Sequence, residues 1–125
     1  MATQTLNLVS KSLDVPDAIR EVGNGKMEFV HLEGNVIARI LLKPGWRWSK
    51  DMKPAMRTNL CQAHHLQYVI SGRLVVRMED GTELDLRPGD CVSIAPGHDA
   101  WVVGNEPFVA IDFTGLKEYR SEYVP

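Results

Sequence analysis

The sequence predicts an all-β protein, a β-sandwich or barrel with little helix. Short segments rich in β-branched and aromatic residues are separated by recurring turn signals such as Gly34-Asn35, Pro88-Gly89 and Pro96-Gly97. Asp80-Gly81 stands between two such segments, and Asp-Gly is the strongest short-range signal for a β-hairpin. Roughly eight short strands with this punctuation are typical of a two-layered or closed β architecture.

The expected strands follow one another along the chain. Their sequences are MEFVHL, NVIARILL, LQYVIS, RLVVRME, TELDL, DCVSI, AWVV and FVAIDF, which span residues 27–32, 35–42, 66–71, 73–79, 82–86, 90–94, 100–103 and 108–113. We expect residues 62–71 and 73–79 to form adjacent antiparallel strands joined tightly at Ser71-Gly72, with Gly72 in a conformation that a β-branched residue resists. The one helical candidate lies near Val15–Glu21, with Pro16 in its first turn, and the piece LKEYRSEY at 116–123 is ambiguous.

Length, charge and cysteine content limit the classes of function. At 125 residues the chain fits one domain. Its 14 basic and 16 acidic residues nearly cancel, so no bulk field attracts nucleic acid or an anionic membrane. The N-terminal MATQTLNLVSKSLDVPDAIR lacks the pattern of a signal peptide, and no stretch is long and apolar enough to span a bilayer, so we expect a cytoplasmic protein. Cys61 and Cys91 are then expected to be reduced thiols.

The stretch NLCQAHHLQYVISG, residues 59–72, carries most of the reactive side chains. In an extended strand, alternate side chains point to opposite faces. One face then carries the polar set Asn59, Cys61, His65 and Gln67. The other face carries His64 with three apolar side chains, and we expect it to be covered by the N-terminal strands or by a second subunit. His65 rather than His64 is therefore the expected functional histidine.

The segment HHLQYVISGRLVVRMEDGTELDLRPGDCVSIAPGHDAWVV resembles the core of a short, single-domain bacterial cupin, a double-stranded β-helix of the jelly-roll type. The resemblance covers about residues 36–113 of a single domain, 1–125, and is strongest in YVISGRLVVRMEDG and LRPGDCVSIAPG. In cupins, the motifs G-x5-H-x-H-x3-E-x6-G and G-x5-P-x-G-x2-H-x3-N supply three histidines and a glutamate that hold a divalent metal inside the barrel. The resemblance therefore implies a jelly-roll barrel with a site in its interior.

Other residues occupy the positions of the cupin ligands in this chain. His65 stands where the glutamate of the first motif falls, and Cys61 and Asn59 take the places of the H-x-H pair. In the second motif Ala100 replaces the ligand histidine, with His98 two residues earlier. The resemblance thus implies a cluster of polar residues at the usual site without the usual ligands.

Two interpretations of this cluster stay open. In one, a Cys61 thiolate and the imidazoles of His65 and His98 bind a divalent metal such as zinc, iron, nickel or manganese and leave a fourth position for water or substrate. In the other, no metal is bound, Cys61 is a small buried hydrophobe, and both histidines are hydrogen-bonded in a ligand pocket. For nucleophilic catalysis by Cys61, the sequence shows neither an orienting third group nor an oxyanion hole.

Further residues are candidates for contact with a ligand. The indoles of Trp48 and Trp101 can line a concave pocket for a flat or apolar molecule, or they can simply cover the barrel ends. Asp99 can orient His98, or it can cap a turn before a strand. The expected ligand-binding residues are Asn59, Gln67, Trp48, Trp101 and Asp99.

Three classes of function follow. The first is a cupin that binds a small organic molecule, with or without a metal, as a sensor or carrier. The second is a metal-dependent enzyme, such as an oxygenase, isomerase or lyase, acting on a small organic substrate. A purely structural role is disfavoured, because buried polar residues are costly to keep. No nucleic-acid motif or phosphate-binding loop is present, and we expect a homodimer formed by sheet packing or N-terminal strand exchange.

Overall fold

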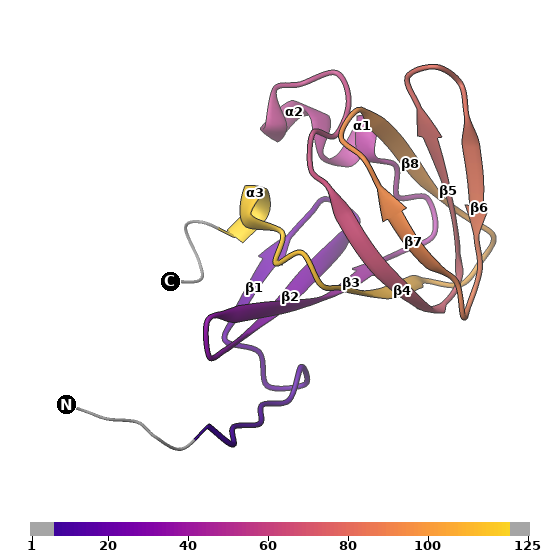
Figure 1. Ribbon diagram of the computed structural model, residues 1–125. Helices are drawn as coiled ribbons and strands as arrows, with labels where there is room; N and C mark the ends of the chain where they lie inside the picture. The colour runs from indigo at the N-terminus through magenta and orange to yellow at the C-terminus, as the bar shows by residue number, and fades with distance from the viewer. Residues whose placement is uncertain (1–6, 121–125) are drawn as a thin grey trace.

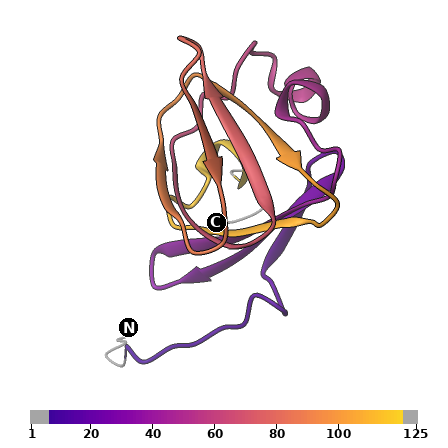
Figure 2. The ribbon, with the colours of Figure 1, turned by 90° about the vertical axis from the view of Figure 1, so that its right-hand side faces the viewer.

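The computed structural model describes residues 7–120, which form a β-barrel of two antiparallel sheets (Figures 1 and 2). The larger sheet has the strand order β1-β2-β3-β9-β4-β7. In that order its strands are β1 (Ala18–Glu21), β2 (Gly25–Leu32), β3 (Asn35–Leu42), β9 (Phe108–Asp112), β4 (His65–Ser71) and β7 (Cys91–Ile94). The smaller sheet consists of β6 (Glu83–Leu86), β5 (Arg73–Met78) and β8 (His98–Val103). The predicted all-β jelly-roll class is confirmed.

The two sheets enclose one hydrophobic core. Alternate residues of each strand point inward, so the larger sheet buries Ala38, Ile40 and Val69, and the smaller sheet buries Leu74 and Val76. Burying a branched apolar side chain of this kind stabilises the fold by roughly 1.5–3 kcal/mol. The inward positions that are not apolar are therefore the ones that call for a functional explanation.

The connection between β4 and β5 differs from the prediction. β4 pairs with β7 and β9, whereas β5 pairs with β6 and β8, so the predicted hairpin at Ser71-Gly72 is wrong. The chain turns a corner here and passes from one sheet to the other. Gly72 has a φ of 79°, and a side-chain carbon at this position would collide with the backbone of Pro107 and Phe108. The corner therefore requires glycine.

The turn at Asp80-Gly81 forms the hairpin that its sequence predicts. β5 and β6 pair antiparallel on either side of it, with Arg77 opposite Glu83. The Asp80 carboxylate accepts a hydrogen bond from the backbone N–H of Thr82 at 2.9 Å. This local contact is typical of aspartate at the start of a tight turn.

The N-terminal segment and the connection after β3 also differ from expectation. The segment predicted to be helical near Val15–Glu21 contains β1, whose Ala18 lies opposite Phe29 of β2, so pairing at the sheet edge outweighs a weak helical signal. The short helices α1 (Trp48–Asp51) and α2 (Lys53–Met56) precede β4, and α3 (Lys117–Arg120) falls in the ambiguous C-terminal piece. Residues 121–123 of that piece lie outside the described residues. Within 7–120, no helix combines the length and apolar character needed to cross a bilayer.

The outer face of β4 is not covered by the N-terminal strands. β1 and β2 extend the larger sheet beyond β3 instead of packing over it. Leu66, Tyr68 and Ile70 are consequently 44% to 47% exposed. The N-terminal strands therefore do not cover this face. A second subunit is the expected covering that is still consistent with the described strands.

Candidate functional site

Backbone pairing brings three side chains with metal-binding atoms together. β4 alternates strictly, so His65 and Gln67 point into the barrel. Cys61, just before β4, forms an isolated antiparallel bridge with His98 at the start of β8, in which the Cys61 N–H donates to the His98 carbonyl at 2.8 Å. The bridge therefore joins the segment before β4, a strand of the larger sheet, to β8 of the smaller sheet.

Cys61, His65 and His98 form a compact, buried cluster. Their ligand atoms all lie within 4.8 Å of one another. The Cys61 Sγ is 3.8 Å from Nε2 of His65, and the two imidazole rings lie edge to face with centroids 5.2 Å apart. The donor set of one thiolate and two imidazoles suits zinc or another borderline-soft divalent ion.

Hydrogen bonds fix the orientation of both imidazoles. Asp112 Oδ2 lies 2.9 Å from Nδ1 of His65, and the carbonyl oxygen of Ala95 lies 2.7 Å from Nδ1 of His98. An ionised carboxylate and a carbonyl can only accept, so each Nδ1 carries a proton and donates it. Each Nε2 is then the atom that faces the cluster, an arrangement that is general among histidine metal ligands.

In the metal-free protein this cluster contains an ion pair. Burial alone would raise the pKa of the Cys61 thiol, but hydrogen bonds with His65 and His98 outweigh it and lower that pKa to about 6. Burial also disfavours the charged form of His65, yet its contacts with Asp112 and Cys61 raise the pKa of His65 to about 9. At neutral pH Cys61 is therefore a thiolate, which is the form that binds metals.

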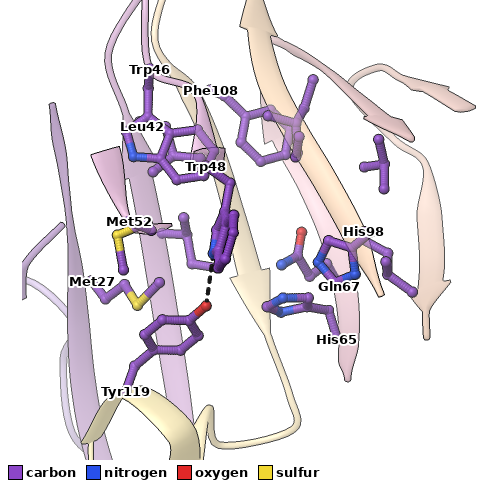
Figure 3. A pocket seen from close by; sticks show the side chains of 15 residues that line it. Met27, Leu42, Trp46, Trp48, Met52, His65, Gln67, His98, Phe108 and Tyr119 are labelled. Carbon is purple, nitrogen blue, oxygen red and sulfur yellow. Dashed lines mark hydrogen bonds between the residues drawn. The ribbon is translucent and has the colours of Figure 1, made fainter. Parts of the chain in front are cut away.

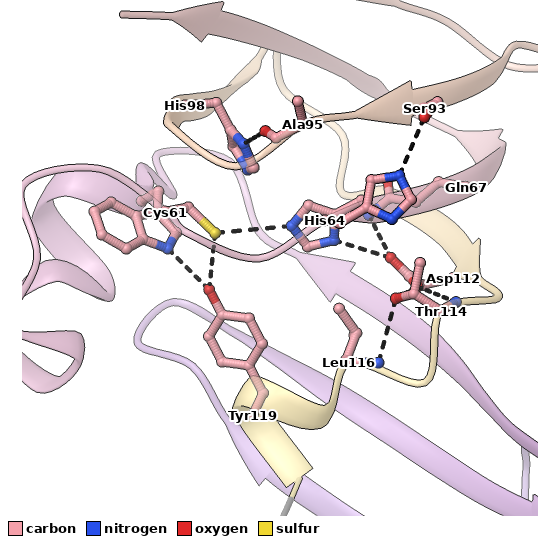
Figure 4. A network of polar contacts seen from close by, with 12 residues as sticks. Cys61, His64, Gln67, Ser93, Ala95, His98, Asp112, Thr114, Leu116 and Tyr119 are labelled. Carbon is pink, nitrogen blue, oxygen red and sulfur yellow. Dashed lines mark hydrogen bonds and ion pairs between the residues drawn. The ribbon is translucent and has the colours of Figure 1, made fainter.

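Asp112 is the central acceptor of the polar network (Figure 4). It is fully buried at the end of β9, where it accepts from His65, from Nε2 of Gln67 at 3.1 Å, and from the N–H and hydroxyl of Thr114 at 2.8 and 2.6 Å. Burial would raise the pKa of Asp112, but the contacts with His65 and Thr114 lower it, so the carboxylate stays ionised. Asp112 was not among the residues predicted from the sequence, although a single aspartate in the otherwise apolar segment FVAIDF is a usable signal.

Tyr119 and Trp48 complete the network beside the thiol. The Tyr119 hydroxyl lies 3.1 Å from the Cys61 Sγ and accepts a hydrogen bond from the indole N–H of Trp48 at 3.1 Å. Burial and the neighbouring Cys61 raise the pKa of Tyr119, so its hydroxyl stays protonated and donates a hydrogen bond to the thiolate. Trp48 belongs to the predicted set, whereas Tyr119 lies in the C-terminal piece for which the sequence pattern was ambiguous.

A narrow cavity lies beside the cluster inside the barrel (Figure 3). His65, His98 and Gln67 form one wall, and Trp48 and Tyr119 face them across the cavity. The remaining lining is apolar and consists of Met27, Ile40, Leu42, Trp46, Met52, Leu74, Val76, Ile94, Ala100 and Phe108. Apolar walls with a few convergent polar groups are typical of a site for a small organic molecule.

Solved structures identify the architecture. Ectoine synthase from P. lautus superposes with a TM-score of 0.63 at 15% identity, over 93% of this chain and 87% of its own. A cupin-like protein from Thermotoga maritima gives 0.52 at 17% identity, over 80% and 74% of the two chains. A Klebsiella pneumoniae protein with a double-stranded β-helix domain gives 0.53 at 23% identity, over 82% and 85%. The chain has the cupin fold. No protein-family model matches the sequence, and no curated protein matches it.

The cupin barrel leaves several predicted residues away from the cavity. Asn59 is exposed in the segment between α2 and β4. Trp101 has outward parity on β8, where its ring stacks with the guanidinium of Arg47 at 4.4 Å. His64 lies on the outer face of the larger sheet, with Nε2 3.2 Å from the hydroxyl of Ser93 (Figure 4). The outward position of His64 agrees with the strand parity.

Asp99 also has a different place from the one expected. It shares the outward parity of Trp101, and its carboxylate accepts from the backbone N–H of Ser49 at 3.1 Å. It therefore fixes α1 against β8. The group that orients His98 is the backbone carbonyl of Ala95, and the carboxylate that orients a histidine is Asp112.

Proposed function

We propose that this cupin-fold chain binds a divalent metal through Cys61, His65 and His98 and holds a small organic molecule in the adjacent cavity. The anchoring of both Nδ1 atoms, by Asp112 and by the Ala95 carbonyl, is the observation that carries the proposal. It directs two Nε2 atoms and one thiolate sulfur toward the same small volume. Buried histidines are usually hydrogen-bonded whatever their role, but the convergence of two anchored imidazoles and a thiolate on one small volume is typical of a metal site.

The donor set narrows the choice of metal. A thiolate with two imidazoles favours zinc, with iron and nickel next and manganese, which prefers oxygen ligands, last. Cys61, His65 and His98 would hold the ion and leave a coordination position for another ligand, and the ion would supply a Lewis acid toward an oxygen of the bound molecule or of water.

The surrounding residues set the protonation of the site. Asp112 holds a proton on Nδ1 of His65, and the Tyr119 hydroxyl donates a hydrogen bond to the thiolate of Cys61. Trp48 in turn fixes the Tyr119 hydroxyl. These groups are all buried, so their hydrogen bonds act at low local dielectric, where they are strong and directional.

The same residues resemble a nucleophile with an oriented base, since Asp112 contacts His65 and His65 contacts Cys61. The cavity favours the metal-binding role. His65 and His98 line it, whereas Cys61, 1% exposed, does not. A nucleophile must touch its substrate, but a metal ligand needs only to reach the metal.

A metal-dependent enzyme, such as an oxygenase, isomerase or lyase, is the second candidate. Ectoine synthase, one of the similar structures, is an enzyme by name. Catalysis by a bound ion needs a free coordination position that faces the substrate cavity. A sensor or carrier would hold its ligand through the same metal and cavity residues. Both candidates depend on the metal, which is therefore the first property to measure.

Metal analysis of the purified protein tests this proposal. We expect about one divalent ion per chain in the unaltered protein and little in His98→Ala, because the remaining two ligands hold an ion poorly. His64→Ala is the matched control, since His64 adjoins His65 in sequence but faces outward. It should keep its metal. Loss of metal from His64→Ala, or failure of the unaltered protein to retain zinc after reconstitution, would contradict the proposal.

We further propose that the chain forms a homodimer through the outer face of the larger sheet. Leu66, Tyr68, Ile70 and Phe113 are 44% to 50% exposed there, and Phe113 donates a backbone hydrogen bond to Leu66 at 2.9 Å. A contiguous apolar patch on a sheet face is typical of an interaction surface. The cavity lies on the opposite side of the same strands, so this contact leaves it unobstructed.

A further inference from the structure

One buried side-chain oxygen among the described residues has no hydrogen-bond partner, and it belongs to Gln67. Gln67 is 5% exposed and lines the cavity on the same wall as His65 and His98 (Figure 3). Buried acceptors in native proteins are nearly always paired, so an unpaired Oε1 at a cavity indicates a missing partner.

The orientation of this amide is set by Asp112. Gln67 Nε2 donates to Asp112 Oδ2 at 3.1 Å, and the same oxygen accepts from His65 at 2.9 Å. Turning the amide over would place Oε1 against an ionised oxygen with no proton between them. Oε1 is therefore the atom left for the cavity, where it can accept a hydrogen bond but not donate one.

We propose that the cavity binds a small, uncharged, largely apolar molecule whose O–H or N–H group donates a hydrogen bond to Gln67 Oε1. This inference rests on the proposed function, because the molecule is the one held beside the metal cluster. Trp48 and Phe108 supply flat apolar walls for it.

The rest of the lining supports an uncharged molecule. No lysine or arginine is among the described residues that line the cavity, so the metal cluster is the one cationic partner there, and most of the lining is apolar and favours an uncharged molecule. A single water at Oε1 would leave the apolar part of the cavity unfilled, since most of the lining side chains are apolar. An organic molecule with an O–H or N–H group can donate to Oε1 and also pack against the apolar side chains of the cavity.

Phenol, anisole and toluene are probes of similar size that test this directly. Phenol carries a donor, anisole keeps the oxygen without a donor, and toluene has neither. In calorimetric titrations of the full chain we expect phenol to bind about tenfold more tightly than the other two. Metal-free and zinc-loaded protein are titrated separately, since the phenol oxygen can also coordinate a metal. A preference that persists without metal is due to the protein.

Two variants assign the preference to its residue. Gln67→Met keeps the length of the side chain but removes the acceptor, so phenol and toluene should bind equally. Met52→Leu, another change in the cavity lining, should keep the preference for phenol. If Gln67→Met does not fold, equal binding of phenol and anisole to the metal-free unaltered protein still overturns the inference.

Equal binding of phenol and anisole to the metal-free protein, the same preference in Gln67→Met, or no binding of any probe would overturn the inference. Metal content measured on the same samples separates it from the proposed function. A metal-loaded protein without donor preference contradicts the ligand class alone. A donor preference in a chain that retains no metal contradicts the metal site alone.

Discussion

A single carboxylate oxygen, Oδ2 of Asp112, serves two different purposes in this site. It fixes the proton on His65, and it fixes the amide of Gln67. The first contact prepares a metal ligand and the second prepares an acceptor for the bound molecule. A change at this one position should therefore alter both properties, although Asp112 does not line the cavity.

Replacing Asp112 with asparagine should weaken zinc binding about 10- to 100-fold, the usual effect of losing the partner behind a histidine ligand. The reason is that His65 loses the anion that holds its Nδ1 proton and its ring orientation. Competition with a chromophoric chelator measures the affinity. Asp99→Asn is the control, because Asp99 contacts Ser49 rather than a histidine of the cluster. Equal weakening by both changes would indicate general destabilisation instead.

The Cys61 thiol should titrate near pH 6 in the metal-free protein, because hydrogen bonds with His65 and His98 stabilise its thiolate. The ultraviolet absorbance of the thiolate, followed in a Cys91→Ser background to remove the exposed thiol, reports this titration. Replacing His65 with glutamine removes the nearest positive charge, so the midpoint should move to higher pH. A midpoint that does not move would show that His65 has no influence on the thiol.

At the scale of the element, β4 and the corner that follows it organise the site. The strand carries His65 and Gln67 on its inner face, and Gly72 then directs the chain into the other sheet. The corner is possible only because no side chain separates Gly72 from Pro107 and Phe108. Phe108 is the first residue of β9 and Asp112 is the last. The close approach at Gly72 therefore also places β9, which carries Asp112, next to β4.

Gly72→Ala should destabilise the protein by about 2–4 kcal/mol, because it combines a positive φ with a collision against backbone atoms. Gly104→Ala is the matched control. Gly104 has a φ of 91° but nothing within 4 Å of an added carbon, so the cost there should be about 1 kcal/mol. Urea unfolding measures both. Similar losses for the two variants would mean that the close approach at Gly72 is relaxed easily.

Local pattern was sufficient to predict β2 to β9, although not β1, and to predict which face of β4 each side chain occupies. The alternation of His64 and His65 alone separates the outer histidine from the inner one. The positions of Asp112 and Tyr119 could not be obtained in this way, because they depend on how β9 pairs with β4 and how α3 packs near Cys61. Likewise, a glycine between two predicted strands does not indicate whether those strands pair with each other or belong to different sheets. At Gly72 the outcome depends on the backbone of Pro107 and Phe108, more than thirty residues further along the chain.

At the scale of the whole molecule, the two sheets differ in what they present to solvent. The larger sheet exposes an apolar group on β4 and directly after the adjacent β9, formed by Leu66, Tyr68, Ile70 and Phe113. The smaller sheet exposes Leu84 among charged neighbours such as Glu83 and Asp85. Of these two surfaces, the first is the one with several neighbouring exposed apolar side chains, which is typical of a subunit contact.

Light scattering at micromolar concentration should show a dimer, and Tyr68→Glu should convert it to a monomer that keeps its metal, because a buried unpaired carboxylate is costly at an interface. Leu84→Glu introduces the same charge at an exposed apolar residue of the other sheet and should leave the dimer intact. A monomeric unaltered protein, or a dimer lost equally in both variants, would exclude this surface as the interface.

The position of β9 determines when the barrel can be completed. β9 is the last strand within residues 7–120, yet it lies in the middle of the larger sheet, between β3 and β4. During synthesis, β3 and β4 therefore keep unpaired edges until residues 108–112 are made and β9 can insert between them. Pairings between such distant segments form slowly. A chain that ends at residue 106 should neither unfold cooperatively nor hold zinc, as urea titration and metal analysis would show. Cooperative unfolding of that shortened chain would mean that the strands before β9 are stable without it.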